Sequence, residues 1–243
     1  ATARDIVYVV PESTAEGKDG SSWANALTDL QQAIDLASVG KGSVWIKSGT
    51  YAPAAEEKGR IAAFTLYDGV KLYGGFAGTE SAVTERSAAA APTILSAKTK
   101  DGGFRYCHVV YGANDAVLDG LTIRDGKADG FTYNGKGGGL LAYHAGETYK
   151  PLGNYASTGF AMQIANCRFE DNQAIEGGAI YAFSKAKLTI SNTIFADNQA
   201  VYGGAVLSRE GNVFTYDKCE FRSNRATRDG GATWELRQIS VAR

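Results

Sequence analysis

Several residue types that build common functional sites are scarce in this sequence of 243 residues. Three cysteines, Cys107, Cys167 and Cys219, are too few and too scattered for a disulfide framework or a zinc site, and we expect Cys167 and Cys219 to be reduced. The two histidines, His108 and His144, argue against His-rich metal binding and against a buried Ser-His-Asp site. No apolar run reaches the roughly 18 residues that a membrane-spanning helix needs.

An excess of one charge is also missing, because 25 Lys and Arg residues face 26 Asp and Glu residues. The net charge of −1 therefore favours neither nucleic acid nor an anionic membrane as a partner. Proline is rare, with 4 residues, whereas glycine is abundant, with 30. Such a chain turns often without being a disordered linker, and its 44% hydrophobic residues supply a core.

An eight-residue segment occurs three times in the C-terminal third, at 167–174, 193–200 and 219–226. Its phenylalanines, Phe169, Phe195 and Phe221, are 26 residues apart. Each copy continues into Gly-Gly-Ala, at 177–179, 203–205 and 230–232. A period in the twenties indicates a solenoid in which one repeat forms one turn, either a leucine-rich repeat or a β-helix. Leucine is sparse at the repeated positions and the short runs are β-branched or aromatic, which favours the β-helix.

Alternation within a repeat predicts which side chains face the core. Cys167 and Phe169 should point inward and Arg168 outward. We expect the three phenylalanines to form one buried column that begins at Ile123, and Asn172, Asn198 and Asn224 to form a second column. The chain must bend at Asn166, Asn192 and Lys218, and asparagine tolerates the left-handed conformation of such a bend.

An earlier coil fits the same frame at 118–123, with Gly120 at the bend and glycines at 137–139. Phe169 follows Ile123 by 46 residues, which is 20 more than one period, so we expect an inserted loop at 144–160. Short apolar runs at 44–46, 70–73, 93–95 and 108–110 predict irregular coils further upstream.

Between Ser22 and Gly40 the apolar spacing becomes helical. Ser21 or Ser22 can cap this helix, Gly40 can end it, and its apolar face would cover the first coil. The residues of that face are Trp23, Leu27, Leu30, Ile34 and Ala37.

We therefore predict an all-β fold, a right-handed parallel β-helix with coils of about 26 residues and an N-terminal amphipathic capping helix. Residues 1–243 form a single domain in this interpretation. It has an N-terminal strand and capping helix at 1–43, irregular coils at 44–115 and regular coils at 116–243. At its C-terminal end we expect either further coils or a partner that covers the last one.

The repeats resemble those of the polymorphic outer-membrane-protein family, whose marks are Gly-Gly-Ala-Ile and Phe-x-x-Asn. Residues 177–180 with 169–172 carry these marks, and so do 203–206 with 195–198; the third copy departs, with Thr233 and an extra Asp229. The stretches 19–26, 48–51 and 73–80 resemble the start of large secreted bacterial β-helix proteins that carry such repeats. The resemblance implies a secreted or cell-surface protein of the bacterial outer membrane that acts as an adhesin or passenger domain, without a set of catalytic residues.

The strand after each glycine pair offers a candidate binding surface. If Ile180 faces inward, Tyr181 faces outward, and the same parity makes Leu141, Leu207 and Trp234 an exposed stripe for a glycan or a surface protein. The opposite parity would make the stripe part of the core. Two tyrosines of the predicted loop, Tyr149 and Tyr155, are further candidate binding residues.

Aligned coils also place Asp125, Asp171 and Asp197 at one repeat position, about 4.8 Å apart. Two charges at that distance repel by roughly 3.5 kcal/mol at an effective dielectric constant near 20. Either water screens the three carboxylates at a turn, or calcium lies between them as the single possible cofactor.

Catalysis is the alternative to binding, because right-handed β-helices often form polysaccharide lyases and glycoside hydrolases of the pectin-lyase-like type. Such enzymes need two carboxylates across a cleft, or a basic residue beside calcium-binding acids. Asp125, Asp171, Glu147 and Arg168 could be arranged in that way, but no local motif marks them. Fold alone does not decide function, and we interpret the chain as a carbohydrate-binding, adhesin-like or structural module rather than an enzyme.

Overall fold

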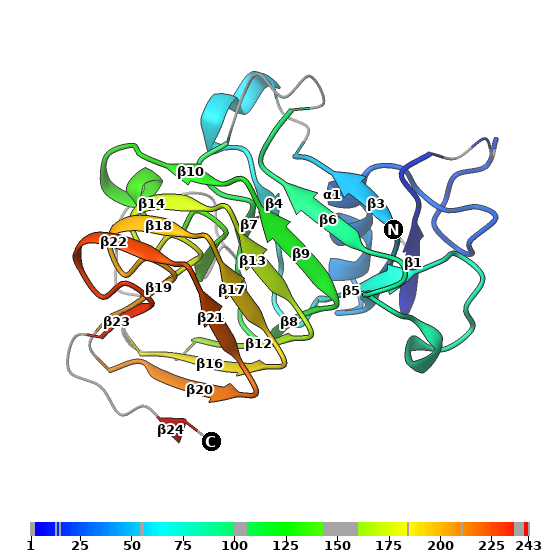
Figure 1. Cartoon of the computed structure of the whole chain (residues 1–243). Coiled ribbons are helices and arrows are strands. Elements are labelled where there is room, and N and C mark those ends of the chain that lie inside the picture. The colour runs from blue at the N-terminus through cyan, green and yellow to red at the C-terminus, as the bar shows by residue number, and fades with distance from the viewer. Residues whose placement is uncertain are drawn as a thin grey trace.

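The computed structural model describes residues 3–12, 14, 16–53, 56–99, 106–142, 160–183, 185–209, 211–235 and 241–242. Their strands form four sheets, and every strand pairing within these sheets is parallel (Figure 1). Consecutive strands lie in different sheets, and each pass of the chain adds one strand to the edge of each sheet.

Each sheet is a row of neighbouring strands, named below in spatial order. Sheet 1 contains β1 (Ile6–Val9), β2 (Ser43–Lys47), β5 (Lys71–Phe76), β8 (Ala116–Asp119), β12 (Phe160–Ala165), β16 (Ala186–Ser191), β20 (Val213–Asp217) and β24 (Val241–Ala242). Sheet 2 contains β3 (Gly49–Tyr51), β6 (Thr93–Ser96), β9 (Leu121–Arg124), β13 (Arg168–Glu170), β17 (Ile194–Ala196) and β21 (Glu220–Arg222). Sheet 3 contains β10 (Lys127–Ala128), β14 (Gln173–Glu176), β18 (Gln199–Tyr202) and β22 (Arg225–Asp229). Sheet 4 contains β4 (Phe64–Thr65), β7 (Val110–Tyr111), β11 (Leu140–Ala142), β15 (Ile180–Ala182), β19 (Val206–Ser208) and β23 (Thr233–Glu235).

The helical elements of the described residues are one α-helix, α1 (Leu30–Ser38), and three short 3-10 turns, η1 (Glu56–Ile61), η2 (Val83–Glu85) and η3 (Thr132–Gly135). This part of the chain is thus an all-β structure of stacked, parallel sheets with a single α-helix, as the predicted β-helix requires. The predicted irregular coils upstream of residue 116 supply strands to sheets 1, 2 and 4.

Two predicted columns run through the core. Phe195 pairs in register with Phe169 on one side and Phe221 on the other, and Phe169 pairs with Ile123. The rings stack nearly parallel, with centroids 5.3 and 4.8 Å apart. Both the phenylalanine column and its 26-residue spacing are confirmed.

The asparagine column is a hydrogen-bonded ladder. Asn172 Nδ2 donates to Asn198 Oδ1, and Asn198 Nδ2 donates to Asn224 Oδ1, both at 3.0 Å. Asn198 Nδ2 also lies 2.9 Å from the Phe169 carbonyl oxygen, to which it donates. Because Asn172 and Asn198 are fully buried, each amide needs these partners, and the prediction of a second column is confirmed.

Three bends with positive φ divide each regular coil. The first is at Gly120, Asn166, Asn192 and Lys218, the second at Asp125, Asp171, Asp197 and Ser223, and the third at Gly137, Gly177, Gly203 and Gly230. The second glycine of each pair is required for space, since a Cβ on Gly178 would lie 2.2 Å from the Gly204 carbonyl oxygen. The Gly-Gly of the repeat therefore serves backbone geometry.

The expected insertion is split in two. Ile123 pairs with Phe169, 46 residues later, but Leu140 pairs with Ile180, only 40 residues later. The difference of 6 residues lies before β11, in the turn 129–136 that contains η3. The single loop predicted at 144–160 is therefore wrong in extent: Phe160 begins β12, and residues 144–159 lie outside the described residues. The extra Asp229 causes a register shift between β18 and β22.

The predicted helix begins eight residues too early. Asp29 caps α1, because its carboxylate accepts a hydrogen bond from the Gln32 N–H at 3.0 Å. Leu27 instead pairs with β1, donating to Tyr8 O and accepting from Val10 N, both at 2.9 Å. Trp23 packs on Phe76 and donates to Glu80 O at 2.9 Å, so the motifs at 19–26 and 73–80 contact each other. Backbone pairing of Leu27 explains why the helix does not start at Ser21 or Ser22.

The helix covers the first strand of sheet 4. Its apolar residues Leu30, Ala33, Ile34 and Ala37 are buried. The Gln31 amide pairs with the backbone of β4, accepting from Thr65 N at 2.8 Å and donating to Thr65 O at 3.1 Å. This amide satisfies edge groups that would otherwise invite strand addition, as expected of a cap.

The three cysteines are free thiols in the structure, as expected for Cys167 and Cys219. Thr193 lies between those two residues in the stack and accepts a hydrogen bond from the Cys167 N–H.

His108 is the buried titratable group of the core. Its Nδ1 donates to the Gly137 carbonyl oxygen at 2.9 Å, and its Nε2 has no hydrogen-bond partner within the described part of the chain. Burial lowers the pKa of His108 to about 4. The ring is therefore neutral at pH 7.

We expect Phe195→Ala to lower the free energy of unfolding by about 3–5 kcal/mol, because it opens a cavity between two stacked rings. Urea denaturation followed by circular dichroism measures this loss. Phe221→Ala is the matched control and should cost less, since Phe221 is only half-buried. A loss below about 1 kcal/mol for Phe195→Ala would contradict the column.

Acid should destabilise the fold through His108. The unfolded chain binds a proton near pH 6.5 and the folded chain only near pH 4, so stability present above pH 6.5 is lost as pH falls. At pH 4.5 we expect this loss to be about 2.5 kcal/mol relative to pH 7. His108→Gln should lack this component, so the difference in unfolding free energy between the two proteins should shrink by that amount. Equal pH dependence of both proteins would disprove the role of His108.

Candidate functional site

The outer face of sheet 4 carries a continuous apolar column. Register places Tyr111, Leu141, Tyr181, Leu207 and the backbone of Trp234 side by side. Their chain neighbours Leu140, Ile180 and Val206 belong to the main core, whereas Leu141, Tyr181 and Leu207 form a separate cluster. The strand after each glycine pair thus turns Ile180 toward the core and Tyr181 away from it.

This column is covered, not exposed. Tyr181 is 2% exposed, and Leu141 and Leu207 are equally buried, so the expectation of an exposed stripe is wrong for these residues. Four half-buried aromatic residues pack against them: Tyr111, Tyr133, Phe183 and Tyr202. Covering an apolar row is favourable by about 25 cal/mol per Å². The side chain of Trp234 and all of Tyr149 and Tyr155 lie outside the described residues.

Charged groups complete the cover over Tyr181. Glu176 Oε2 accepts from Lys136 Nζ at 2.6 Å and from Arg209 Nη2 at 2.7 Å. Lys136 Nζ lies 4.6 Å from the centre of the Tyr181 ring, and Arg209 Nε donates to the Tyr181 hydroxyl at 2.9 Å. Burial raises the pKa of Tyr181, although the hydrogen bond from Arg209 lowers it. The tyrosine is therefore neutral and held in place, which suits support rather than proton transfer.

Exposed groups gather beside this cluster, at the corner between sheets 3 and 4. Phe131, in the turn 129–136, is 93% exposed, and Ile175 of β14 is also exposed. Arg228 lies over the Tyr202 ring and donates to its hydroxyl at 2.6 Å. We call Phe131, Ile175, Tyr202 and Arg228 the corner surface. Sequence reasoning missed it, although the 6 extra residues of this coil were a signal once the period was known.

The predicted aspartate ladder lies at the second bend of the coils. Asp125 is buried, whereas Asp171 and Asp197 are exposed. Arg124 connects the first two aspartates, with Nε 3.0 Å from Asp125 Oδ2 and Nη2 3.3 Å from Asp171 Oδ2. Lys98 Nζ lies 3.0 Å from the other oxygen of Asp125.

Burial would raise the pKa of Asp125, but hydrogen bonds from Lys98 and Ser96 and the charge of Arg124 outweigh it, so the pKa is lowered. No three His, Cys, Asp or Glu residues lie close enough to hold a metal ion among the residues described. Protein cations thus meet the carboxylates at Asp125 and Asp171. Calcium at Asp125, Asp171 and Asp197 stays a prediction without a ligand set in the described structure.

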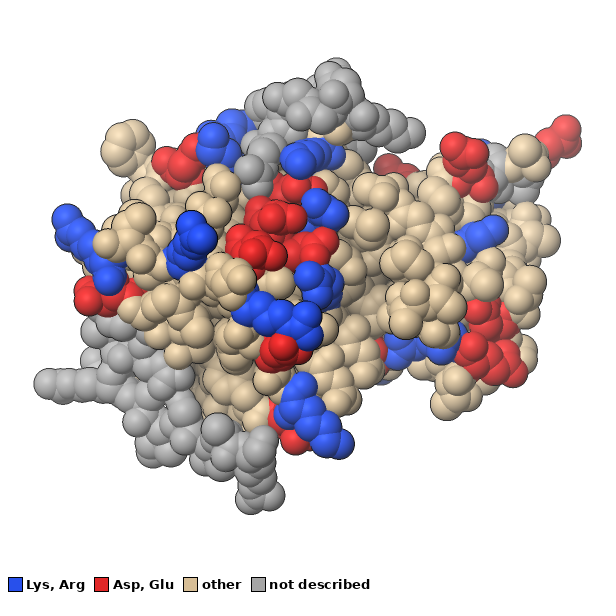
Figure 2. Space-filling view, viewed as in Figure 1, with Lys and Arg blue, Asp and Glu red and all other residues tan. Residues whose placement is uncertain are grey.

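Ion pairs continue along the outer face of sheet 2. Glu170 pairs with Arg124 and Arg168, and Glu220 pairs with Arg222. Figure 2 shows acidic and basic side chains side by side in the middle of the viewed face. The candidate catalytic set is therefore a chain of ion pairs at Asp125, Asp171 and Arg168, while Glu147 lies outside the described residues.

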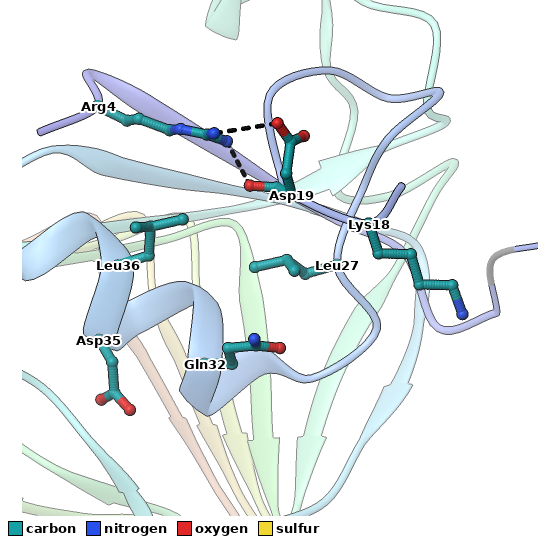
Figure 3. Close-up of a pocket in the computed structure, with 7 residues that line it drawn as sticks. All are labelled: Arg4, Lys18, Asp19, Leu27, Gln32, Asp35 and Leu36. Carbon is teal, nitrogen blue, oxygen red and sulfur yellow. Dashed lines mark hydrogen bonds and ion pairs between the residues drawn. The ribbon is translucent and has the colours of Figure 1, made fainter. Parts of the chain in front are cut away.

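A hollow of about 490 Å³ opens at the N-terminal end (Figure 3). Its lining residues are Arg4, Lys18, Asp19, Leu27, Gln32, Asp35 and Leu36. Arg4 donates to the carboxylate and the carbonyl of Asp19, and hydrogen bonds from Ser21 followed by Arg4 lower the pKa of Asp19 to about 2. Asp35 accepts from Gln31, so the acidic groups of the hollow serve the cap itself.

Comparison with known proteins identifies one coil of the stack. Residues 166–182 match the Chlamydia polymorphic membrane protein repeat. The segment runs from the bend at Asn166 through β13 and β14 to Ala182, the last residue of β15. Neither the curated proteins nor the solved structures gave a match. Among the described helices, none is long and apolar enough to cross a membrane.

We expect Glu176→Ala to lower the free energy of unfolding by about 1–3 kcal/mol, because Lys136 and Arg209 lose their shared counter-charge beside a buried ring. Glu220→Ala removes an exposed pair and should change it by less than about 1 kcal/mol. Chemical denaturation of both variants checks the contrast. Equal losses would contradict the structural role of Glu176.

Proposed function

We propose that this chain is a right-handed parallel β-helix of a secreted or surface-exposed bacterial protein, and that it acts as an adhesin-like binding or structural module without catalysis. The match of residues 166–182 to an outer-membrane-protein repeat carries this proposal. The coil that holds this match is flanked on both sides by coils in register with it, which supports extending the interpretation along the stack.

The residues of the repeat signature have structural roles. Phe169 fills the core, Asn172 closes the ladder and Gly178 makes room for the neighbouring backbone. None of these roles fixes what the outer faces carry. A stack of coils with free outer positions is a rigid display surface, which suits binding.

The enzyme alternative is less favoured on the described charges. A lyase or hydrolase needs acids and a base directed at a substrate. Here Arg168 pairs with Glu170, and Asp125 is buried between Lys98 and Arg124. These groups neutralise one another.

Binding and catalysis can be separated with the purified chain. We expect saturable binding to bacterial or animal cells in flow cytometry, and no release of unsaturated uronides or reducing ends from polygalacturonate or alginate, with or without calcium. Heat-denatured chain is the control and should not bind saturably. Depolymerisation that Arg168→Gln abolishes would establish the enzyme instead, and absence of cell binding would refute the adhesin-like function.

A further inference from the structure

We propose that the corner surface binds an acidic glycan, a proposal that rests on the chain being a binding module and names its ligand class and site. Phe131, Tyr202 and Arg228 are the residues expected to contact the sugar.

The aromatic part of the site is a preformed platform. Phe131 is 93% exposed, yet its turn is fixed by hydrogen bonds from Gly130 N to Asn134 O at 3.1 Å and from Lys136 N to Tyr133 O at 3.0 Å. The ring is therefore held in water by an ordered backbone. The apolar C–H face of a sugar ring stacks on such a ring, and little order must be gained on binding.

The charge of the corner favours an anion. Lys136, Arg209 and Arg228 face one carboxylate of the cluster, Glu176, and counting the neighbouring Asp229 still leaves one positive charge in excess. Lys136 and Arg209 are held by Glu176, whereas Arg228 stacks on the uncharged Tyr202 side chain and donates to its hydroxyl. An exposed guanidinium of this kind can form a bidentate bond with a carboxylate or sulfate.

The dimensions fit a short linear glycan. Phe131 follows β10 and Arg228 lies in β22, three strand steps apart in sheet 3. At about 4.8 Å per step the site spans roughly 14 Å. The buried column of Tyr181 and Leu207 beneath it keeps the platform rigid. The exposed apolar residues are few and polar groups separate them, which favours a sugar over the larger apolar patch of a protein partner.

The test is binding of the whole chain to tetragalacturonic acid, a heparin tetrasaccharide and neutral cellotetraose by isothermal titration calorimetry. We expect the acidic probes to bind, to weaken as salt rises, and to bind better than cellotetraose. Arg228→Gln and Phe131→Ser should each weaken acidic-probe binding by about five- to tenfold. Lys187→Gln, an exposed change of the same charge on the outer face of sheet 1, is the matched control and should leave affinity unchanged. Circular dichroism verifies that each variant is folded.

Unchanged affinity in both corner variants would overturn the proposal, and so would cellotetraose binding as tightly as the acidic probes. If the chain binds cells but none of the acidic probes, the glycan site is refuted while the binding function stands. If it binds neither cells nor probes, both proposals fail.

Discussion

The structure depends on the left-handed backbone at three bends in every regular coil. These bends return the chain so that each strand lies beside its equivalent in the next coil, and only then can parallel hydrogen bonds form along all four sheets. Few residue types tolerate this conformation, which explains why the bends carry glycine, asparagine and aspartate. The lysine at Lys218 and the serine at Ser223 occur in the last regular coil. The core columns follow from this constraint, because phenylalanines and asparagines stack only when each coil closes on the same register.

Features fixed by the period were predictable from sequence, whereas features fixed by a single contact were not. Phe195 and Asn198 recur at a constant interval, so their columns could be placed. The start of α1 could not, because Leu27 has helical spacing yet forms backbone hydrogen bonds with β1. The inserted residues could be counted but not divided, since only the separate registers of Phe169 and Ile180 reveal that 6 of them precede β11.

The candidate site shows the same division. Alternation correctly separated Tyr181 from Ile180, but exposure depends on side chains that come from other columns. Lys136, Tyr133 and Arg209 reach over Tyr181 from outside its own strand, and no sequence pattern links them. The aspartate ladder was likewise visible as a repeat. Its counter-charge was not, because Arg124 belongs to the preceding strand and faces the carboxylates only after the bend.

Burial separates the residues of the repeat signature from those that can contact a ligand. Gly178 and Asn172 are excluded from such contact by their place in the backbone stack and the core, so the matched segment describes how a coil is built. Specificity has to come from outward positions and from coils that depart from the period. The turn 129–136 is such a departure, and it places an exposed aromatic ring, Phe131, beside the column that carries Tyr181. Two chains with the same signature can therefore share a scaffold and differ in ligand through one turn of a few residues.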